Sequence, residues 1–230
     1  QLSVMPHSIY TVGDALFEKC ASFAKEEGFI LHTHLSETEE EVKTCLERTG
    51  KMPVEHLYDL GVLGENFVAA HGVHVSEKEM ELLASSKSTV VHNPASNLKL
   101  SSGLFKMQEM LSRNVRIALG TDGASSNNNL DMHEAMKFAS LLAKRENPEI
   151  LPAEEAFKMA SSYDYDESKA ETENKWKKFF SASKVTLKDK EIESFYNSSL
   201  YHLAGCMGNA EFPPGLFGNF VTDDFFPWAG

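Results

Sequence analysis

Residues 29–38 read FILHTHLSET, a short apolar run that ends in polar side chains. Gly28 precedes the run and closes a helical pattern, so the run reads as a buried strand that starts just after a helix. Strands that follow helices in this way are typical of a parallel sheet built from repeated βα units. The polar residues then lie at the carboxyl end of the strand, where such architectures place their active sites.

The same alternation continues through residue 160. We expect further strands near 2–5, 67–71, 89–92 and 115–120, separated by amphipathic helical patterns. Thr11 is the expected cap of a helix over 12–27, and Ser76 with Glu79 forms a capping box for another helix. The pattern predicts an α/β fold with about five parallel strands over 1–160, followed by a small helical segment over 161–230.

Composition and charge narrow the class of protein. The chain has 230 residues, 42% of them hydrophobic, which suffices for a globular core. Its net charge of −12 disfavours a nucleic-acid partner, and no apolar run approaches the ~20 residues that span a bilayer. Three dispersed cysteines without a CxxC pair predict neither a disulfide framework nor a thiolate zinc site. We therefore expect a soluble, cytoplasmic protein.

Five consecutive expected strands end in His or Asp. For any single histidine, packing in the core or a loop is the better interpretation. Five such residues in phase with the βα repeat instead indicate a shared site at the carboxyl ends of the strands. These strand-end residues are His7, His34, His71, His92 and Asp122.

The motifs around these residues carry a family resemblance. HLSET at 34–38, AAHGVH at 69–74, VHNPASNLKL at 91–100 and LGTDGASSNN at 119–128 keep a common order and approximate spacing. Together they resemble the amidohydrolase superfamily, in its methylthioadenosine/S-adenosylhomocysteine deaminase and chlorohydrolase branch. The resemblance implies that residues 1–160 form a partial (β/α)8 TIM-like barrel. It also implies a metal-dependent hydrolytic deaminase whose substrate is a small adenosine derivative.

The resemblance also implies roles for individual residues. His34 and Asp122 are expected metal ligands, and Asp122 also acts as a base. Glu37 is expected to shuttle protons to the substrate ring and to bind the substrate, while His71 contacts the attacking hydroxide or the ligand. His7 is expected to bind substrate. The implied cofactor is a divalent metal, zinc in the first place and iron as the alternative, because such a metal lowers the pKa of water to ~7.

The other histidines are interpreted as structural. His32 shares a strand face with His34, and an HxH pair is itself an amidohydrolase signature. In the family that signature ends the first strand, whereas Leu-Ser-Glu-Thr marks the fifth, so His32 is expected to pack in the wall. His74 is expected to cap a loop. Surface or core packing is expected of His56, His133 and His202.

Nothing before His7 supplies the first-strand HxH pair that the resemblance implies. We therefore expect two imidazole ligands to be missing, weak metal binding through His34 and Asp122 alone, and an incomplete chain that releases no ammonia by itself. A sheet of five strands also leaves two open edges, which predicts self-association.

The last part of the chain suggests a second resemblance. From about residue 165 it weakly resembles a fragment of an (α/α)6-barrel glycoside hydrolase, chiefly through PPGLFGNFVTDDFFPWAG at 213–230. Asp223 and Asp224 beside Trp228 suit sugar hydroxyls and pyranose faces, and a turn-rich loop with solvated acids is the alternative interpretation. Two joined resemblances suggest a chimeric chain. The alternative function is therefore a non-catalytic or carbohydrate-binding fragment.

Overall fold

A computed structural model describes residues 2–145 and 147–161 and, further along, residues 173–174, 177–178, 181 and 186–206. Contacts between residues divide the chain into two units, Gln1–Ser168 and Lys169–Gly230. The first unit contains the sheet and the strand-end residues. Each unit is described by itself below.

The first unit is built on a sheet of five parallel strands in the order β1-β2-β3-β4-β5. Spatial order follows chain order, as in one arc of a barrel wall. This sheet confirms the predicted α/β class and the predicted number of strands. The strands are β1 (Ser3–Val4), β2 (Ile30–Leu35), β3 (Phe67–His71), β4 (Thr89–His92) and β5 (Arg116–Leu119).

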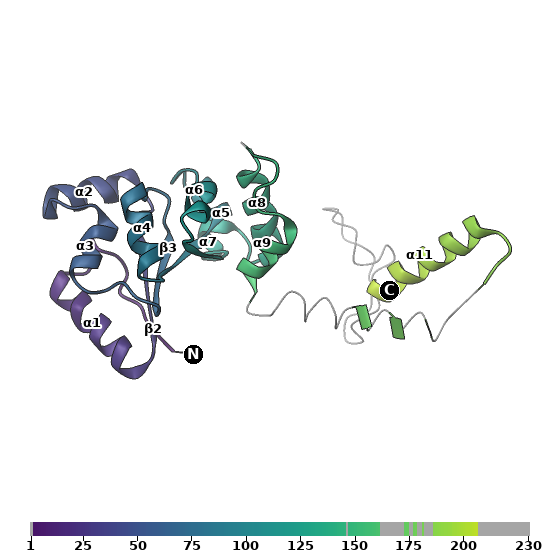
Figure 1. The fold of residues 1–230 in the computed structure, drawn as a ribbon, viewed down its shortest axis with the longest axis horizontal. Coiled ribbons are helices and arrows are strands. Elements are labelled where there is room, and N and C mark those ends of the chain that lie inside the picture. Colours follow the sequence, from purple (N-terminus) through teal and green to yellow (C-terminus); the bar gives the residue numbers. More distant parts are fainter. Residues whose placement is uncertain are drawn as a thin grey trace. The chain divides into compact units, whose positions relative to one another are not determined.

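Helices follow every strand, and α1, α3 and α4 lie along one side of β2 and β3 in Figure 1. Nine helices are described in the first unit and one longer helix in the second. Those of the first unit are α1 (Asp14–Glu27), α2 (Glu39–Thr49), α3 (Pro53–Asp59), α4 (Glu77–Ser85), α5 (Pro94–Lys99), α6 (Met107–Ser112), α7 (Ala124–Asn127), α8 (Met132–Ala143) and α9 (Ala153–Ala160); α11 (Lys190–Cys206) belongs to the second.

The two faces of the sheet differ in burial. Leu31 and Leu35 of β2 and Phe67 of β3 are at most 1% exposed and belong to the main hydrophobic core. Alternation along the strands places His32 and His34 on the opposite face, where both are only half-buried. Helices therefore cover one face of the sheet, while the described residues leave the other face partly open.

The helix boundaries partly differ from those predicted. The capping box of Ser76 and Glu79 at α4 is confirmed. The prediction of Thr11 as the cap of α1 is wrong, because α1 starts at Asp14 with Gly13 as its N-cap. The Thr11 hydroxyl instead hydrogen-bonds with the side chains of His7 and Ser8. The short helices α5 and α7 were not predicted.

In the second unit, α11 runs over Lys190–Cys206, within the helical segment predicted over 161–230. Two of its apolar side chains are not buried, since Phe195 is 75% exposed and Ile192 is also exposed. The glycosidase-like motif with Asp223, Asp224 and Trp228 lies outside the described residues. Within the described part of the chain, no helix is both long enough and apolar enough to cross a membrane.

Candidate functional site

Three of the predicted site histidines come together at the carboxyl ends of β2 and β3. The ring centroid of His34 lies 4.7 Å from that of His7 and 5.5 Å from that of His71, on which it stacks at 18°. A parallel bridge between Ser8 and His34 holds the segment after β1 beside β2. The strand ends therefore gather His7, His34 and His71. The βα pattern also assigned His92 to this site, and that is wrong, because His92 pairs with the core residue Leu119 on the helix-covered face of the sheet.

The orientation of His71 depends on its backbone. In the strand register His71 pairs with Leu35, a core residue on the helix-covered face, so regular alternation would aim it away from His34. His71 instead has a φ of 74°, which a residue other than glycine seldom adopts. Its ring is 1% exposed and stacks on His34. A strained backbone at the end of a strand is typical of functional sites.

Glu37 faces His71 across the site. Its Oε2 lies 3.8 Å from His71 Nε2, and its Oε1 accepts a hydrogen bond of 3.2 Å from Ser102 Oγ. The Glu37 side chain is 18% exposed. The structure therefore places the predicted proton shuttle beside the predicted hydroxide-contacting residue, with an oxygen within ion-pair distance of the imidazole.

Glu41 is a residue that sequence reasoning missed. Its carboxylate is 5% exposed and accepts hydrogen bonds of 2.8 Å from the backbone N–H groups of Ser36 and Glu37. Burial raises the pKa of Glu41, although these two N–H groups act in the opposite direction. The available signal was the Thr38-x-x-Glu41 spacing of a capping box. That spacing marks Glu41 as a helix-start residue, but its contacts fix the backbone that carries Glu37.

Asp122 follows β5 and is held by three donors. Ser96 Oγ at 2.6 Å, Ser126 Oγ at 2.8 Å and the Gly123 N–H at 2.7 Å donate to its carboxylate. Burial raises the pKa of Asp122, but these hydrogen bonds and the charge of His71 outweigh it and lower the pKa below its usual value. Asp122 is therefore an ionised carboxylate, coupled electrostatically to His71.

Hydrogen bonds to carbonyl oxygens fix which nitrogen of each imidazole carries a proton. His34 Nδ1 lies 2.8 Å from the His7 carbonyl oxygen, and His71 Nδ1 lies 2.9 Å from Asn97 Oδ1. Since these oxygens only accept, both Nδ1 atoms must donate. The Nε2 lone pair of neutral His34 is then available to a ligand, in the arrangement usual for metal-binding histidines.

The side-chain types at the site suit a divalent metal, but the described residues provide too few ligands for one. Imidazole and carboxylate are suitable ligands for zinc, which usually takes four. Among the described residues, no group of three or more His, Cys, Asp or Glu side chains could hold a metal ion. The chain thus brings His34 and Asp122 as ligand candidates without a complete ligand set.

Among the other histidine side chains that the structure describes, His56 and His74 make structural contacts and His133 lies at the surface. His32 is half-buried on β2, and burial, followed by the charges of His34 and His71, lowers its pKa. His74 Nε2 lies 2.6 Å from the Ser102 carbonyl oxygen, consistent with holding a loop. His56 is buried against Asp14, and the His133 side chain is 91% exposed.

Residues 1–164, which include all of these strand ends, match the model of the Amidohydrolase family. The chain belongs to this family. One relative, a 5-methylthioadenosine/S-adenosylhomocysteine deaminase of Thermococcus sibiricus, is 49% identical over 158 residues, which is 68% of this chain and 37% of the relative. A 5'-deoxyadenosine deaminase of Methanothermobacter thermautotrophicus is 45% identical over 163 residues, 70% of this chain and 38% of the relative.

Solved structures of amidohydrolases show the same fold. An adenosine deaminase from Xanthomonas campestris with bound zinc superposes with a TM-score of 0.66 at 36% identity, covering 68% of this chain and 36% of that one. A guanine deaminase from E. coli gives a TM-score of 0.64 at 27% identity, covering 69% and 37%. This amidohydrolase chain therefore spans well under half the length of the relatives it matches.

Proposed function

We propose that this amidohydrolase chain supplies part of the active site of a divalent-metal-dependent hydrolytic deaminase acting on adenosine-like nucleosides. The observation that carries the proposal is the buried His71, stacked on His34 and faced by Glu37 at the ends of adjacent strands. The deaminase names of the relatives give the reaction class, and methylthioadenosine or S-adenosylhomocysteine is the corresponding substrate type.

In this proposal His34 binds the metal through Nε2 and Asp122 through its carboxylate. Zinc is the first choice, because the adenosine deaminase from Xanthomonas campestris holds zinc, and iron is the alternative. When bound, a divalent metal makes hydroxide available near neutral pH by lowering the pKa of water to ~7.

Free Cys20 and Cys45 support a cytoplasmic location, where thiols stay reduced.

The chain's own residues would then move the protons. Ionised Asp122 would accept the proton of the attacking water, and Glu37 would deliver a proton to the ring nitrogen so that negative charge does not build up there. Asp122 would then return its proton to the exocyclic amine, which leaves as ammonia when its bond to the ring carbon breaks, and the proton of the new hydroxyl would return to Glu37. His71, oriented by Asn97, contacts the attacking oxygen or the substrate. His7 is exposed beside His34 and is placed to contact the nucleoside.

Zinc titration by calorimetry tests the metal part of the proposal. Because two ligands are fewer than zinc usually takes, we expect weak binding that is lost in both His34→Asn and Asp122→Asn. His133→Asn is the matched control, since His133 is an exposed histidine on α8. Binding that survives both site substitutions, or that falls equally in the control, would contradict these ligand assignments.

An ammonia assay tests the catalytic part. With methylthioadenosine and added zinc, we expect the isolated chain to release no ammonia above the level of the Asp122→Asn variant, because the residues that the structure describes do not form a complete ligand set. Turnover abolished by Glu37→Gln would show instead that a further group completes the site within this chain. If the wild-type chain does release ammonia above that background, undiminished turnover in Glu37→Gln would overturn the role given to Glu37.

A further inference from the structure

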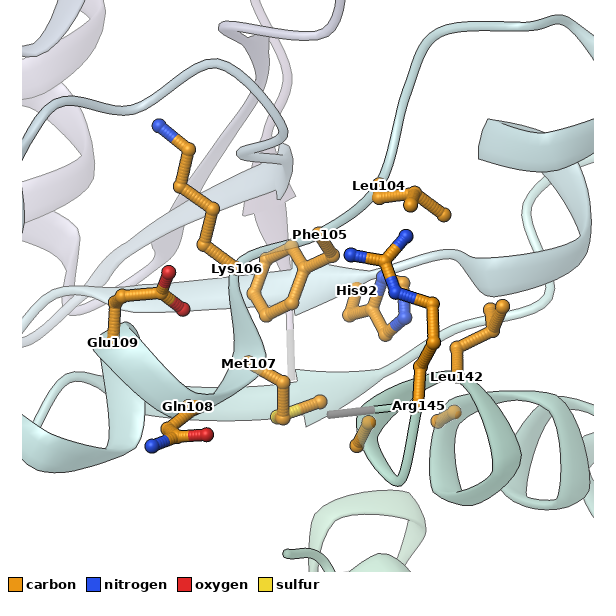
Figure 2. A pocket seen from close by; sticks show the side chains of 11 residues that line it. His92, Leu104, Phe105, Lys106, Met107, Gln108, Glu109, Leu142 and Arg145 are labelled. Atoms are coloured by element: carbon orange, nitrogen blue, oxygen red, sulfur yellow. The ribbon is translucent and has the colours of Figure 1, made fainter. Parts of the chain in front are cut away.

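A second site candidate lies on the helix-covered face of β4, the face opposite to the one that carries His34. A cavity of about 110 Å³ opens between the end of β4, the start of α6 and the end of α8. Leu104, Phe105, Met107 and Leu142 contribute apolar walls (Figure 2). Its volume is of the same order as the ~150 Å³ of an apolar cavity that binds benzene. It therefore has room for one small ring or a short aliphatic chain.

His92 lines the cavity and is 3% exposed. Its ring stacks on Phe105 with centroids 4.3 Å apart at 16°. The amide nitrogen of Asn97 lies 3.4 Å from His92 Nδ1 and can only donate, so Nδ1 accepts and Nε2 carries the proton of the neutral ring. The cavity is therefore lined by an imidazole whose remaining polar atom is an N–H donor.

The charged groups around the cavity favour an anion at one end. Arg145 and Lys106 line it together with Gln108 and Glu109. In Figure 2 the Arg145 side chain projects toward His92, whereas the Glu109 carboxylate lies on the far side of Phe105 from it. Lys106 Nζ donates to the Val75 carbonyl oxygen at 2.9 Å. The end near His92 thus combines a guanidinium with a neutral N–H donor.

We propose that this cavity binds a small monocarboxylate with an apolar body, its carboxylate held by Arg145 and the His92 N–H and its body between Phe105 and Leu142. Guanidinium groups bind carboxylates with strong, directional hydrogen bonds, and the apolar walls remove the rest of the ligand from water. This site is separate from the proposed deaminase site, and its ligand is not the nucleoside.

Benzoate is the probe, titrated into the full chain while the ring signals of isotope-labelled histidines are followed by NMR. We expect saturable shifts of the His92 signals and no binding of benzyl alcohol, which has the same ring without the charge. Arg145→Gln should weaken benzoate binding about tenfold, as expected for loss of a charge-assisted hydrogen bond. Ala143→Leu, which fills the cavity from α8, should abolish it.

Arg48→Gln is the matched control, because Arg48 lies on α2 outside the cavity and pairs with Asp14 at 3.5 Å. It should leave benzoate affinity unchanged. The proposal is overturned if benzoate does not shift the His92 signals, if benzyl alcohol binds equally well, or if Arg48→Gln weakens binding as much as Arg145→Gln. None of these readouts requires catalysis, so they stand whether or not the deaminase proposal holds.

Discussion

At the scale of single residues, Asn97 shows how one buried amide organises two imidazoles. Its Oδ1 accepts from His71 Nδ1 at 2.9 Å, and its Nδ2 lies 3.4 Å from His92 Nδ1. Asn97 is 1% exposed, so neither end of the amide can turn to water instead. The same side chain therefore sets the protonated nitrogen of a candidate catalytic histidine and of a cavity histidine.

His92 gives a pH prediction at this scale. Burial, and after it the charge of His71, lowers the pKa of His92 from 6.5 to about 3. Below pH 6.5, His92 is protonated in the unfolded chain but stays neutral in the folded chain. The contribution of His92 to the free energy of unfolding is therefore fully present above pH 6.5 and decreases as the pH falls toward 3. The slope amounts to about 1.4 kcal/mol for each pH unit at most. Urea denaturation at a series of pH values measures it.

A non-titrating replacement isolates this effect. His92→Phe keeps an aromatic ring against Phe105, with the adjoining cavity to accommodate it, and should flatten the loss of stability between pH 6.5 and 3. His133→Phe, at an exposed position on α8, should leave the slope unchanged. An unaltered slope in His92→Phe would mean that other groups cause the acid sensitivity.

At the scale of elements, one carboxylate joins the starts of two helices. Glu79 of α4 is fully buried, and its Oε1 accepts from the Val54 N–H of α3 at 2.8 Å. Its Oε2 accepts from the N–H and hydroxyl of Ser76, at 2.9 and 2.7 Å. Glu79 thus caps its own helix and ties that helix to α3.

Glu79→Gln tests this link. The glutamine amide retains one accepting oxygen but turns an NH₂ group toward at least one former donor, leaving buried donors unpaired. We expect the free energy of unfolding to fall by about 2 kcal/mol, measured by urea denaturation with an unchanged m value. Glu81→Gln, an exposed position in the same helix, should change it by less than about 0.5 kcal/mol. Equal effects of the two substitutions would refute the linking role.

At the scale of the whole molecule, we propose self-association through the sheet. β1 and β5 are the edges of the described sheet, and residues such as His34 and Ala118 on its second face are only half-buried. Unpaired edge groups and uncovered side chains both favour pairing with another chain. Size-exclusion chromatography with light scattering should therefore show a mass that rises with concentration.

A charge on the uncovered face should oppose this association. Ala118→Lys places an ammonium group on β5, and we expect it to shift the elution toward the monomer without lowering the melting temperature. Ser85→Lys adds the same charge at an exposed end of α4 and should leave the association unchanged. A wild-type chain that stays monomeric at every concentration would contradict the proposal.

The sequence by itself determined the parallel βα order, the capping box of Ser76 and Glu79, and the strand ends that carry His34, His71 and Asp122. These features depend on short-range periodicity and on hydrogen bonds between residues a few positions apart, which the chain order already contains. The chemical roles of those residues are inferred from the family and remain proposals.

Only the tertiary structure decided how the strand-end side chains are oriented and which partners they contact. The turned backbone of His71, the anchoring of Glu37 by Glu41, and the Asn97 amide between two histidines all depend on segments that meet only after the sheet has formed. Residues 71 and 97, for example, are brought together because β3 and β4 are neighbours. Side-chain periodicity fixes the face on which a residue lies, whereas its partner is fixed by packing across strands.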